Sequence, residues 1–313
     1  TSKALLSYAI RGLAAQFSRR RNGMGRVSDK VALISGAARG QGRSHAQMLA
    51  AEGADIIAVD LCADIETNEY PLARVEDLEE TARLVEKEGR TAFTEVADVR
   101  DRAALSDLID RAVEQFGRLD VVVANAGIAP LTAGLPIQGF VDAVDVDLIG
   151  VMNLVHASIK HLTAGASVIL TGSLAASVAS AMSSMGAGMG SAPGGAGYVF
   201  AKQVIGHYAN DLALQLAPQS IRVNAIHPTN CNTEMLHSPP MYRAFRPDLA
   251  SPTREDAELS FPVLQAMPIP YIEPEDVSEV VVFLASDASR YVTGQQIRID
   301  AGAYLKVNPW SGP

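Results

Sequence analysis

The chain has 313 residues, of which 48% are hydrophobic and 5% aromatic, and it carries a net charge of −9. This length permits one large α/β domain or two small ones. The negative charge disfavours nucleic acid as a partner, because phosphate contacts need a basic face. With only two cysteines, Cys62 and Cys231, the chain lacks the composition of a disulfide framework, and a reducing cytoplasm is its expected location.

Residues 1–25 are expected to form a flexible N-terminal extension. Arg11 and Gln16 interrupt the apolar residues there, and the basic run follows them, which is the reverse of a signal peptide. The alternative is a basic amphipathic arm that binds a membrane or a partner. No apolar run is long enough to span a bilayer, so we expect no membrane partner. The folded domain is expected to comprise residues 26–313.

Short apolar runs alternate with helical patterns along this domain. Helical patterns cover residues 43–54, 76–89, 101–117, 140–162, 198–217 and 275–286. The apolar runs predict strands at Val31–Ser35, Asp55–Asp60, Thr91–Val96, Leu119–Ala124, Ser167–Thr171, Ile221–His227 and Gln296–Asp300. This alternation predicts an α/β protein with a single-domain Rossmann fold, in which helices cover both faces of a doubly wound parallel sheet of about seven strands.

Three long connections interrupt the alternation. The first is an acidic insertion at residues 61–75, which contains Pro71. The second, at residues 174–197, is rich in glycine, serine and methionine, and the third, at residues 231–274, is rich in proline. Ligands of open α/β sheets bind outside the carboxyl ends of the strands, so we expect the second and third segments to contact substrate.

Three glycines, Gly36, Gly40 and Gly42, lie between the first expected strand and the helix after it. Glycine lets the backbone turn tightly and approach a pyrophosphate, and the helix N-terminus supplies free N–H groups. A glycine triplet alone is weak evidence for a nucleotide site. Here Asp60 ends the next strand, and this context strengthens the prediction of a dinucleotide site.

Several motifs in sequence order resemble the classical short-chain dehydrogenase/reductase family. They are G-x-x-x-G-x-G at 36–42, Ala-Asp-Val at 97–99, Asn-Ala-Gly at 125–127, Ser173, and the pair Tyr198 and Lys202. The resemblance extends from about residue 26 to residue 306. It implies an oxidoreductase that uses a nicotinamide cofactor.

Asp60 favours NAD over NADP, because a carboxylate there would bind the adenosine ribose hydroxyls and repel a 2′-phosphate. Arg39 favours NADP, but a like-charge contact can cost several kcal/mol, so we expect Asp60 to decide. The resemblance also implies contacts at the adenine, the ribose and the nicotinamide. The complete set of expected cofactor residues is Gly36, Arg39, Gly40, Gln41, Gly42, Asp60, Leu61, Asp98, Val99, Asn125, Ala126, Gly127, Tyr198, Lys202, Pro228, Cys231 and Thr233.

Tyr198 and Lys202 are four residues apart and therefore share one helix face. A tyrosine of ordinary pKa, about 10, is a poor base near neutrality, but a nearby ammonium stabilises the phenolate. Tyr198 is expected to exchange the substrate proton, Ser173 to hold the substrate oxygen and Lys202 to bind the nicotinamide ribose. Such positioned acid–base catalysis typically contributes roughly 10²- to 10⁴-fold. The alternative is that Tyr198 and Lys202 lie on an ordinary amphipathic helix and have no catalytic role.

Asp147 departs from the family pattern, which usually has asparagine at this position. The resemblance assigns that asparagine to a proton relay, so Asp147 is included as a candidate catalytic residue whose charge alters the site. Met235, Met241 and Phe245 are candidates for the substrate pocket because they follow the strand at the nicotinamide end. Met182, Met185 and Met189 could line it too, or fill space in the second long segment. The histidines lack metal-ligand spacing, so no metal is expected.

The insertion after Asp60 narrows the resemblance to the mycofactocin-associated dehydrogenases, a subgroup often called carveol dehydrogenases. The resemblance implies an NAD that exchanges poorly with solution and is reoxidised by mycofactocin. Folding of residues 61–75 over the adenosine ribose would explain slow release. The alternative is a surface insertion beside freely exchanging NAD.

The resemblance therefore predicts interconversion of a secondary alcohol and a ketone, with carveol or another small apolar alcohol as substrate. One alternative is an ordinary, freely exchanging reductase of steroid or acyl carbonyls. Another is a non-catalytic nucleotide-sensing protein, against which the intact Ser173, Tyr198 and Lys202 argue. The resemblance further implies a homotetramer.

Overall fold

The computed structural model describes residues 25–131, 137–178 and 192–308. The expected extension therefore lies outside the described residues except for Gly25, and so do Met182, Met185 and Met189. Among the described helices, none combines the length and apolar character needed to cross a membrane.

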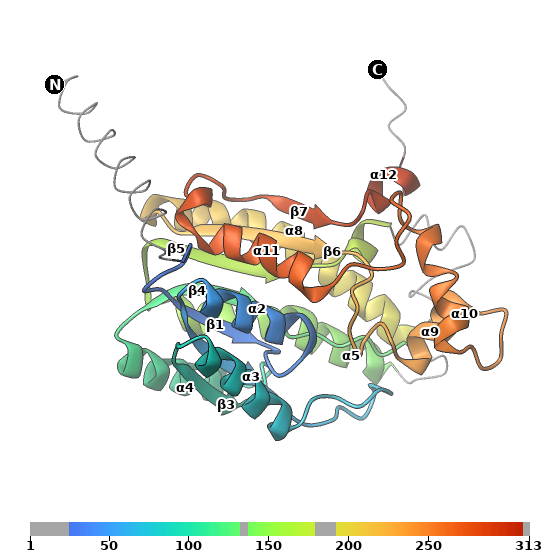
Figure 1. Ribbon diagram of the computed structural model, residues 1–313, viewed down its shortest axis with the longest axis horizontal. Coiled ribbons are helices and arrows are strands. Elements are labelled where there is room, and N and C mark those ends of the chain that lie inside the picture. The colour runs from blue at the N-terminus through green and yellow to red at the C-terminus, as the bar shows by residue number, and fades with distance from the viewer. Residues whose placement is uncertain (1–24, 132–136, 179–191, 309–313) are drawn as a thin grey trace, which may run out of the picture.

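A seven-stranded sheet forms the centre of the molecule, in the order β3-β2-β1-β4-β5-β6-β7 (Figure 1). All paired strands run parallel. Their bounds are β1 Val31–Ser35, β2 Asp55–Asp60, β3 Ala92–Val96, β4 Leu119–Ala124, β5 Leu162–Thr171, β6 Arg222–Pro228 and β7 Gln296–Ile299. The prediction of a doubly wound parallel sheet is confirmed. The strand order reverses direction between β1 and β4, which is where such sheets bind ligands.

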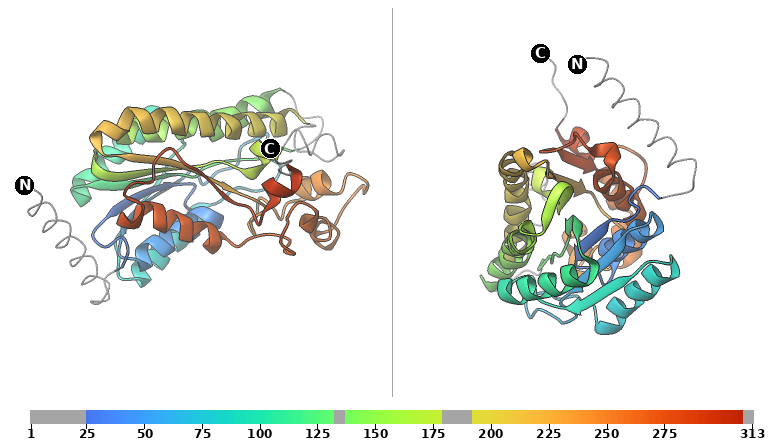
Figure 2. Two further views of the ribbon diagram at one scale, coloured as in Figure 1. Left: turned by 90° about the horizontal axis from the view of Figure 1, so that it is seen from above. Right: turned by 90° about the vertical axis from the view of Figure 1, so that its left-hand side faces the viewer.

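Helices cover both faces of the sheet (Figure 2). One face carries α2 Gly40–Ala51, α3 Val75–Lys87 and α11 Pro274–Ala285, which is followed by the 3₁₀ turn Asp287–Ser289. The other carries α4 Arg102–Phe116, α5 Gln138–Val144, α6 Gly150–Ile159 and α8 Pro193–Leu216, which the 3₁₀ turn Ala217–Gln219 follows. Each layer packs its own set of buried aliphatic side chains against the sheet.

Helix α4 shows how local sequence determines an element. The Asp101 carboxylate caps its start by accepting hydrogen bonds from the backbone N–H groups of Ala103 and Ala104. Leu105 and Leu108 lie on its buried face. Gly117 ends it at φ 76°, a conformation that a residue with a side chain rarely adopts. The expected end at Gly117 is thus confirmed.

Two helical predictions need correction. The pattern at residues 140–162 forms α5 and α6 with a π-helical turn, Asp145–Ile149, between them, and its last residue instead begins β5. Helix α8 begins at Pro193 rather than Tyr198, so its first turn uses residues of the expected glycine-rich connection. Pro193 lies in the first turn, where its fixed φ and missing N–H are tolerated. Gly197 then permits close packing on α5, since a Cβ there would lie 2.6 Å from the carbonyl oxygen of Phe140.

The segment after β6 forms a small helical unit at the carboxyl ends of the strands (Figure 1). It contains α9 Pro239–Phe245, α10 Arg254–Glu258 and the 3₁₀ turn Phe261–Val263. Leu236, Met241, Ala257 and Phe261 form its buried core. The chain ends its described part with α12 Ala303–Val307. The expected loop at 231–274 is therefore partly helical and has apolar packing of its own.

Candidate active site

A cleft lies at the carboxyl ends of the strands and encloses about 1600 Å³ of space, part of it open to solvent. Of the expected site residues, Gly42 alone does not line it. The expected catalytic residues that line it are Asp147, Ser173, Tyr198 and Lys202. The expected cofactor residues that line it are Gly36, Arg39, Gly40, Gln41, Asp60, Leu61, Asp98, Val99, Asn125, Ala126, Gly127, Tyr198, Lys202, Pro228, Cys231 and Thr233.

The turn between β1 and α2 depends on close backbone approach. Gly36 has φ +65°, and a Cβ there would lie 2.8 Å from Cα of Ala126. A Cβ at Gly42 would lie 1.9 Å from the carbonyl oxygen of Gly36, which explains why Gly42 shapes the turn without lining the cleft. The Asn125 side chain donates hydrogen bonds to the carbonyls of Ser35 and Gly36, at 3.2 and 3.3 Å. The start of α2 is therefore held open toward the cleft, as pyrophosphate binding requires.

Asp60 holds this turn at the adenosine end. Its carboxylate accepts hydrogen bonds from the backbone N–H groups of Ala38, at 3.0 Å, and Cys62, at 3.2 Å. Farther along the cleft, Asp98 binds Arg100; burial opposes ionisation of Asp98, but the hydrogen bonds from Arg100 lower its pKa. The cleft therefore has a carboxylate at the carboxyl end of β2, as NAD recognition requires.

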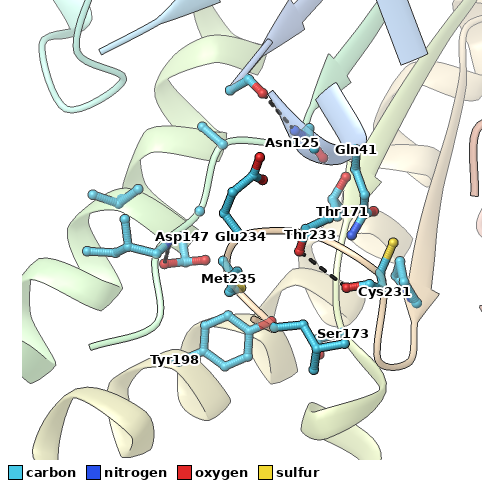
Figure 3. A pocket seen from close by; sticks show the side chains of 18 of the residues that line it. Gln41, Asn125, Asp147, Thr171, Ser173, Tyr198, Cys231, Thr233, Glu234 and Met235 are labelled. Carbon is cyan, nitrogen blue, oxygen red and sulfur yellow. Dashed lines mark hydrogen bonds between the residues drawn. The ribbon is translucent and has the colours of Figure 1, made fainter. Parts of the chain in front are cut away.

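The side chains of Ser173, Tyr198 and Lys202 come together at the other end (Figure 3 shows the first two). A hydrogen bond joins the side chains of Ser173 and Tyr198. Lys202 donates a hydrogen bond to the carbonyl of Thr171 at 3.0 Å, and its Nζ lies 5.7 Å from the centroid of the Tyr198 ring. An alcohol oxygen bound here would meet a hydroxyl donor and a phenol supported by an ammonium.

Opposing influences act on Tyr198. Burial raises its pKa, and so does the negative charge of Asp147. Lys202 and the hydrogen bond from Ser173 lower it. The combined effect of these groups is a raised pKa of Tyr198. The positive charge of an oxidised nicotinamide would favour the phenolate further.

Asp147 lies on the π-helical turn and is completely buried. Its Oδ1 lies 3.0 Å from Nζ of Lys202, and its Oδ2 accepts a hydrogen bond from the backbone N–H of Ile128 at 3.1 Å. The residue that departs from the family pattern is thus in direct contact with a residue of the expected catalytic set.

The cleft lining fits a large polar ligand. Within the described part of the chain, several buried side-chain atoms of the lining have no hydrogen-bond partner; they are Oε1 of Gln41, Oγ1 of Thr171, Oγ1 of Thr229, Nδ2 of Asn230 and Oδ1 of Asp147, the last of which forms an ion pair with Lys202. Unpaired buried polar atoms are costly, and a bound molecule could supply their partners. Their positions at the helix start and at the ends of β5 and β6 match an elongated dinucleotide. Among the described residues, no three His, Cys, Asp or Glu side chains are grouped to hold a metal.

The insertion at 61–75 crosses from β2 toward α9. Tyr70 is buried, lines the cleft and accepts a hydrogen bond from the backbone N–H of Ala129 at 3.3 Å. Thr67 donates to Asp142 in α5 at 2.6 Å. Glu69 forms a 2.8 Å ion pair with Arg243 of α9. The insertion therefore extends well past the end of β2 and contacts helices α5 and α9.

Near Tyr198, part of the cleft lining is apolar. The expected candidates Met235, Met241 and Phe245 all line it, together with Leu174 and Leu264. Among the described lining residues, Glu234 is the one charged side chain from the segment after β6. Such a surface suits a small apolar substrate.

Several lining residues were not predicted from sequence. Tyr70, Thr171 and Glu234 belong to this group, although each is close in sequence to a predicted residue or lies in the noted insertion. His227 lies behind the site: its Nδ1 is 3.3 Å from the carbonyl oxygen of Ser173, and its Nε2 is 2.6 Å from Oε1 of Gln296. Its position at the end of a strand, next to Pro228, was the available signal.

Comparison with known proteins shows to which family the chain belongs. The family model described as enoyl-(acyl carrier protein) reductase matches residues 36–304. The (−)-trans-carveol dehydrogenase of Rhodococcus erythropolis is 44% identical over 289 residues, which is 90% of this chain and all of the relative. The chain belongs to the short-chain dehydrogenase/reductase family. The resemblance inferred from the motifs is thereby confirmed at the level of the family.

Two solved structures of this dehydrogenase family are also similar. The carveol dehydrogenase of Mycobacterium avium in complex with NAD shares 41% identity, with TM-score 0.81, over 90% of this chain and 99% of that one. A short-chain dehydrogenase of Mycobacterium paratuberculosis bound to NAD shares 36% identity, with TM-score 0.74, over 90% and 100%. The expectation of NAD agrees with the cofactor in both.

Proposed function

We propose that this short-chain dehydrogenase uses NAD to interconvert an apolar secondary alcohol and its ketone. The observation that carries the proposal is the grouping of Ser173, Tyr198 and Lys202 at one end of a cleft whose other end has the glycine turn and Asp60. The relation to a carveol dehydrogenase at 44% identity supports the alcohol as substrate class. The NAD in the two similar structures supports the cofactor.

Bound NAD would supply a hydride acceptor at the nicotinamide end of the cleft. Ser173 would hold the substrate oxygen through its hydroxyl. Tyr198, as phenolate, would remove the proton from that oxygen during oxidation and return it during reduction. Lys202 would stabilise the phenolate and bind the nicotinamide ribose. Gln41, Thr229 and Asn230 have the unpaired polar atoms to hold the cofactor.

The apolar pocket supports a hydrocarbon substrate of the carveol kind. Met235, Met241 and Phe245 would exclude water and contact the hydrocarbon, while the polar groups of the site contact only its oxygen. Each buried CH₂ of the substrate would contribute about 0.8 kcal/mol to binding. A steroid or acyl carbonyl reductase remains the rival, and substrate comparison separates the two.

We also propose that the insertion retains NAD and that mycofactocin reoxidises it. Tyr70 is buried over the cleft, and the contacts of Arg39, Thr67 and Glu69 anchor the insertion to three separate elements. Several anchors must open together before the cofactor leaves, which supports slow exchange. A carrier from outside the cleft would then be needed to complete each cycle.

A cytoplasmic homotetramer is the assembly that we propose. Apolar side chains are exposed on the neighbouring helices α5 and α8, among them Val141, Phe200 and Leu214 at 39, 46 and 77%. Burial of such side chains at an interface between copies would support association. Light scattering of the purified protein measures the number of copies directly.

The first experiment combines purified protein, carveol and excess NAD while NADH absorbance is followed. A single burst equal to the amount of enzyme, with turnover restored by an artificial electron acceptor, supports retained NAD. Continuous NADH formation would contradict retention and leave the alcohol dehydrogenase intact. Absence of NADH and of acceptor reduction across a panel of apolar secondary alcohols would overturn the proposed function.

A further inference from the structure

The pair formed by Asp147 and Lys202 is buried at the wall of the cleft. Asp147 is 0% exposed and Lys202 is 3% exposed. The 3.0 Å distance joins Oδ1 of Asp147 to Nζ of Lys202, and the second carboxylate oxygen accepts the N–H of Ile128. Burial raises the pKa of Asp147, while the charge of Lys202 and the hydrogen bond from Ile128 oppose that rise. Ionisation of both partners is favoured by their direct contact, because an isolated buried ammonium would itself be costly.

The backbone at Gly127 approaches the pair closely. A Cβ at Gly127 would lie 2.5 Å from Oδ1 of Asp147 and 3.3 Å from Nζ of Lys202. On its other side Lys202 donates to the carbonyl of Thr171. The ammonium therefore lies between a carboxylate and a carbonyl, and both partially compensate its charge before it acts on the Tyr198 ring.

The groups around Tyr198 come from four elements. Lys202 shares α8 with it, Asp147 approaches from the π-helical turn, and Ser173 follows β5. The phenol of Tyr70 approaches from the insertion, and its own pKa is raised mainly by burial. Behind Ser173 lies His227, whose pKa burial lowers, so it is neutral near pH 7.

Further charged groups of the described lining are Arg39, which acts on Tyr70, and the carboxylates of Glu234, Asp60 and Asp98. Lys202 and Asp147 are thus the two charges that act directly on Tyr198. Their signs are opposite, so removal of either one changes the field at the phenol in a known direction.

We propose that Asp147 is a positioning residue that pairs as a carboxylate with Lys202 and so raises the pH at which Tyr198 becomes a base. The inference rests on the proposed function, because it concerns the base of that reaction. The carboxylate holds the ammonium in place and partly cancels its field. Oxidation of alcohol therefore begins at a higher pH than Lys202 alone would allow.

The substitution Asp147→Asn tests the charge while keeping the shape. Asparagine can still accept the N–H of Ile128, but the ammonium of Lys202 then acts on Tyr198 without compensation. The phenolate becomes easier to form, and the midpoint of the rising limb of kcat for oxidation shifts to lower pH by about one unit or more. Asp145→Asn removes an equal charge from the same helical turn, outside the cleft lining, and is the matched control.

Coincident pH profiles for wild type and Asp147→Asn would overturn the proposal, because they would mean that Asp147 is already neutral. A shift of equal size in Asp145→Asn would overturn it too, since a general change of net charge would then suffice. Thermal unfolding verifies that each variant is folded.

A second readout does not need turnover. Ultraviolet difference titration measures phenolate formation, and subtraction of the curve for the corresponding Tyr198→Phe protein isolates Tyr198. The Tyr198 midpoint is expected to be lower in Asp147→Asn than in wild type, with and without NAD. If the two Tyr198 midpoints differ but the protein oxidises no alcohol, the ion pair stands and the proposed function is rejected. If the midpoints are equal in a protein that does oxidise alcohols, the proposed function stands and the role of the ion pair is rejected.

Discussion

Arg39 of the glycine turn donates a hydrogen bond from Nη2 to the carbonyl oxygen of Pro71 in the insertion, at 2.7 Å. This contact joins the turn that would hold the pyrophosphate to the segment that covers the cleft. From sequence, the guanidinium of Arg39 could have bound the 2′-phosphate of NADP. In the structure it instead binds the insertion. Asp60 lines the same cleft and accepts a hydrogen bond from the N–H of Ala38, the neighbour of Arg39.

Loss of this contact should accelerate cofactor release. We expect Arg39→Ala to increase the NAD dissociation rate by about tenfold, since a hydrogen bond from a charged donor contributes roughly 1.5–3 kcal/mol. Displacement of bound NADH, followed by its fluorescence, measures the rate. Arg83→Ala, an exposed arginine of α3 away from the cleft, is the control. Equal rates in wild type and Arg39→Ala would show that the contact does not limit release.

Removal of the proposed base should abolish turnover without loss of the cofactor. We expect Tyr198→Phe to reduce kcat by roughly 10²- to 10⁴-fold, because the phenol oxygen is the atom that exchanges the proton. The amount of NAD bound, measured after denaturation, should stay the same. A variant that retains wild-type kcat would reject the mechanism.

The carboxylate of Asp60 should determine the choice between NAD and NADP. We expect Asp60→Ala to reduce the preference for NAD by at least about tenfold, because repulsion of a 2′-phosphate by a like charge costs several kcal/mol. The same change removes the acceptor for the N–H groups of Ala38 and Cys62, so NAD binding should weaken as well. Calorimetric titration with both dinucleotides checks the two effects. An unchanged preference would assign discrimination to another residue.

His227 should position Ser173 from behind the site. A Cβ at Gly172 would lie 2.5 Å from the His227 ring, and Gln296 connects that ring to the carbonyl of Gly206 in α8. We expect His227→Ala to reduce kcat about tenfold or more, while the NAD dissociation constant stays the same, since misplacement of a reacting group by even 1 Å is costly. His227→Gln, which can accept or donate similar bonds, should restore part of kcat. Equal losses in both variants would argue against this positioning.

His45 should make the fold sensitive to acid. It is completely buried, its Nδ1 lies 2.7 Å from Oγ of Ser278 in α11, and burial lowers its pKa to about 3. Because its pKa in the unfolded chain is about 6.5, the unfolded state binds the proton first as pH falls. The stability that neutral His45 provides is present above pH 6.5 and is lost progressively toward pH 3, by about 4 kcal/mol.

Urea unfolding of wild type and His45→Gln between pH 7 and pH 4 measures this loss. The variant should be less stable at pH 7 and show a shallower decline as pH falls. His207→Gln, exposed on α8, should follow wild type. Parallel declines in wild type and His45→Gln would show that other groups cause the acid sensitivity.

Local sequence patterns alone predicted the strands of the sheet and several residues of the site. Short apolar runs predicted all seven strands, because buried parallel strands need short, continuous apolar segments. Their ends agree within one residue except in β5, which begins at Leu162 rather than Ser167. The glycine turn, Ser173, Tyr198 and Lys202 were recognised because each role restricts the residue type. The π-helical turn at Asp145–Ile149 and the early start of α8 at Pro193 were missed, since they depend on how helices pack rather than on periodicity.

Only the tertiary structure decided which distant side chains meet. Residue spacing could mark Asp147 as a departure but could not place its carboxylate 3.0 Å from Nζ of Lys202. Nor could it show that Tyr70 reaches Ala129, or that Glu69 pairs with Arg243. Local sequence determines backbone geometry through short-range sterics and hydrogen bonds. Charges and contacts between segments far apart in the chain depend on the sheet order and helix packing that bring those segments together.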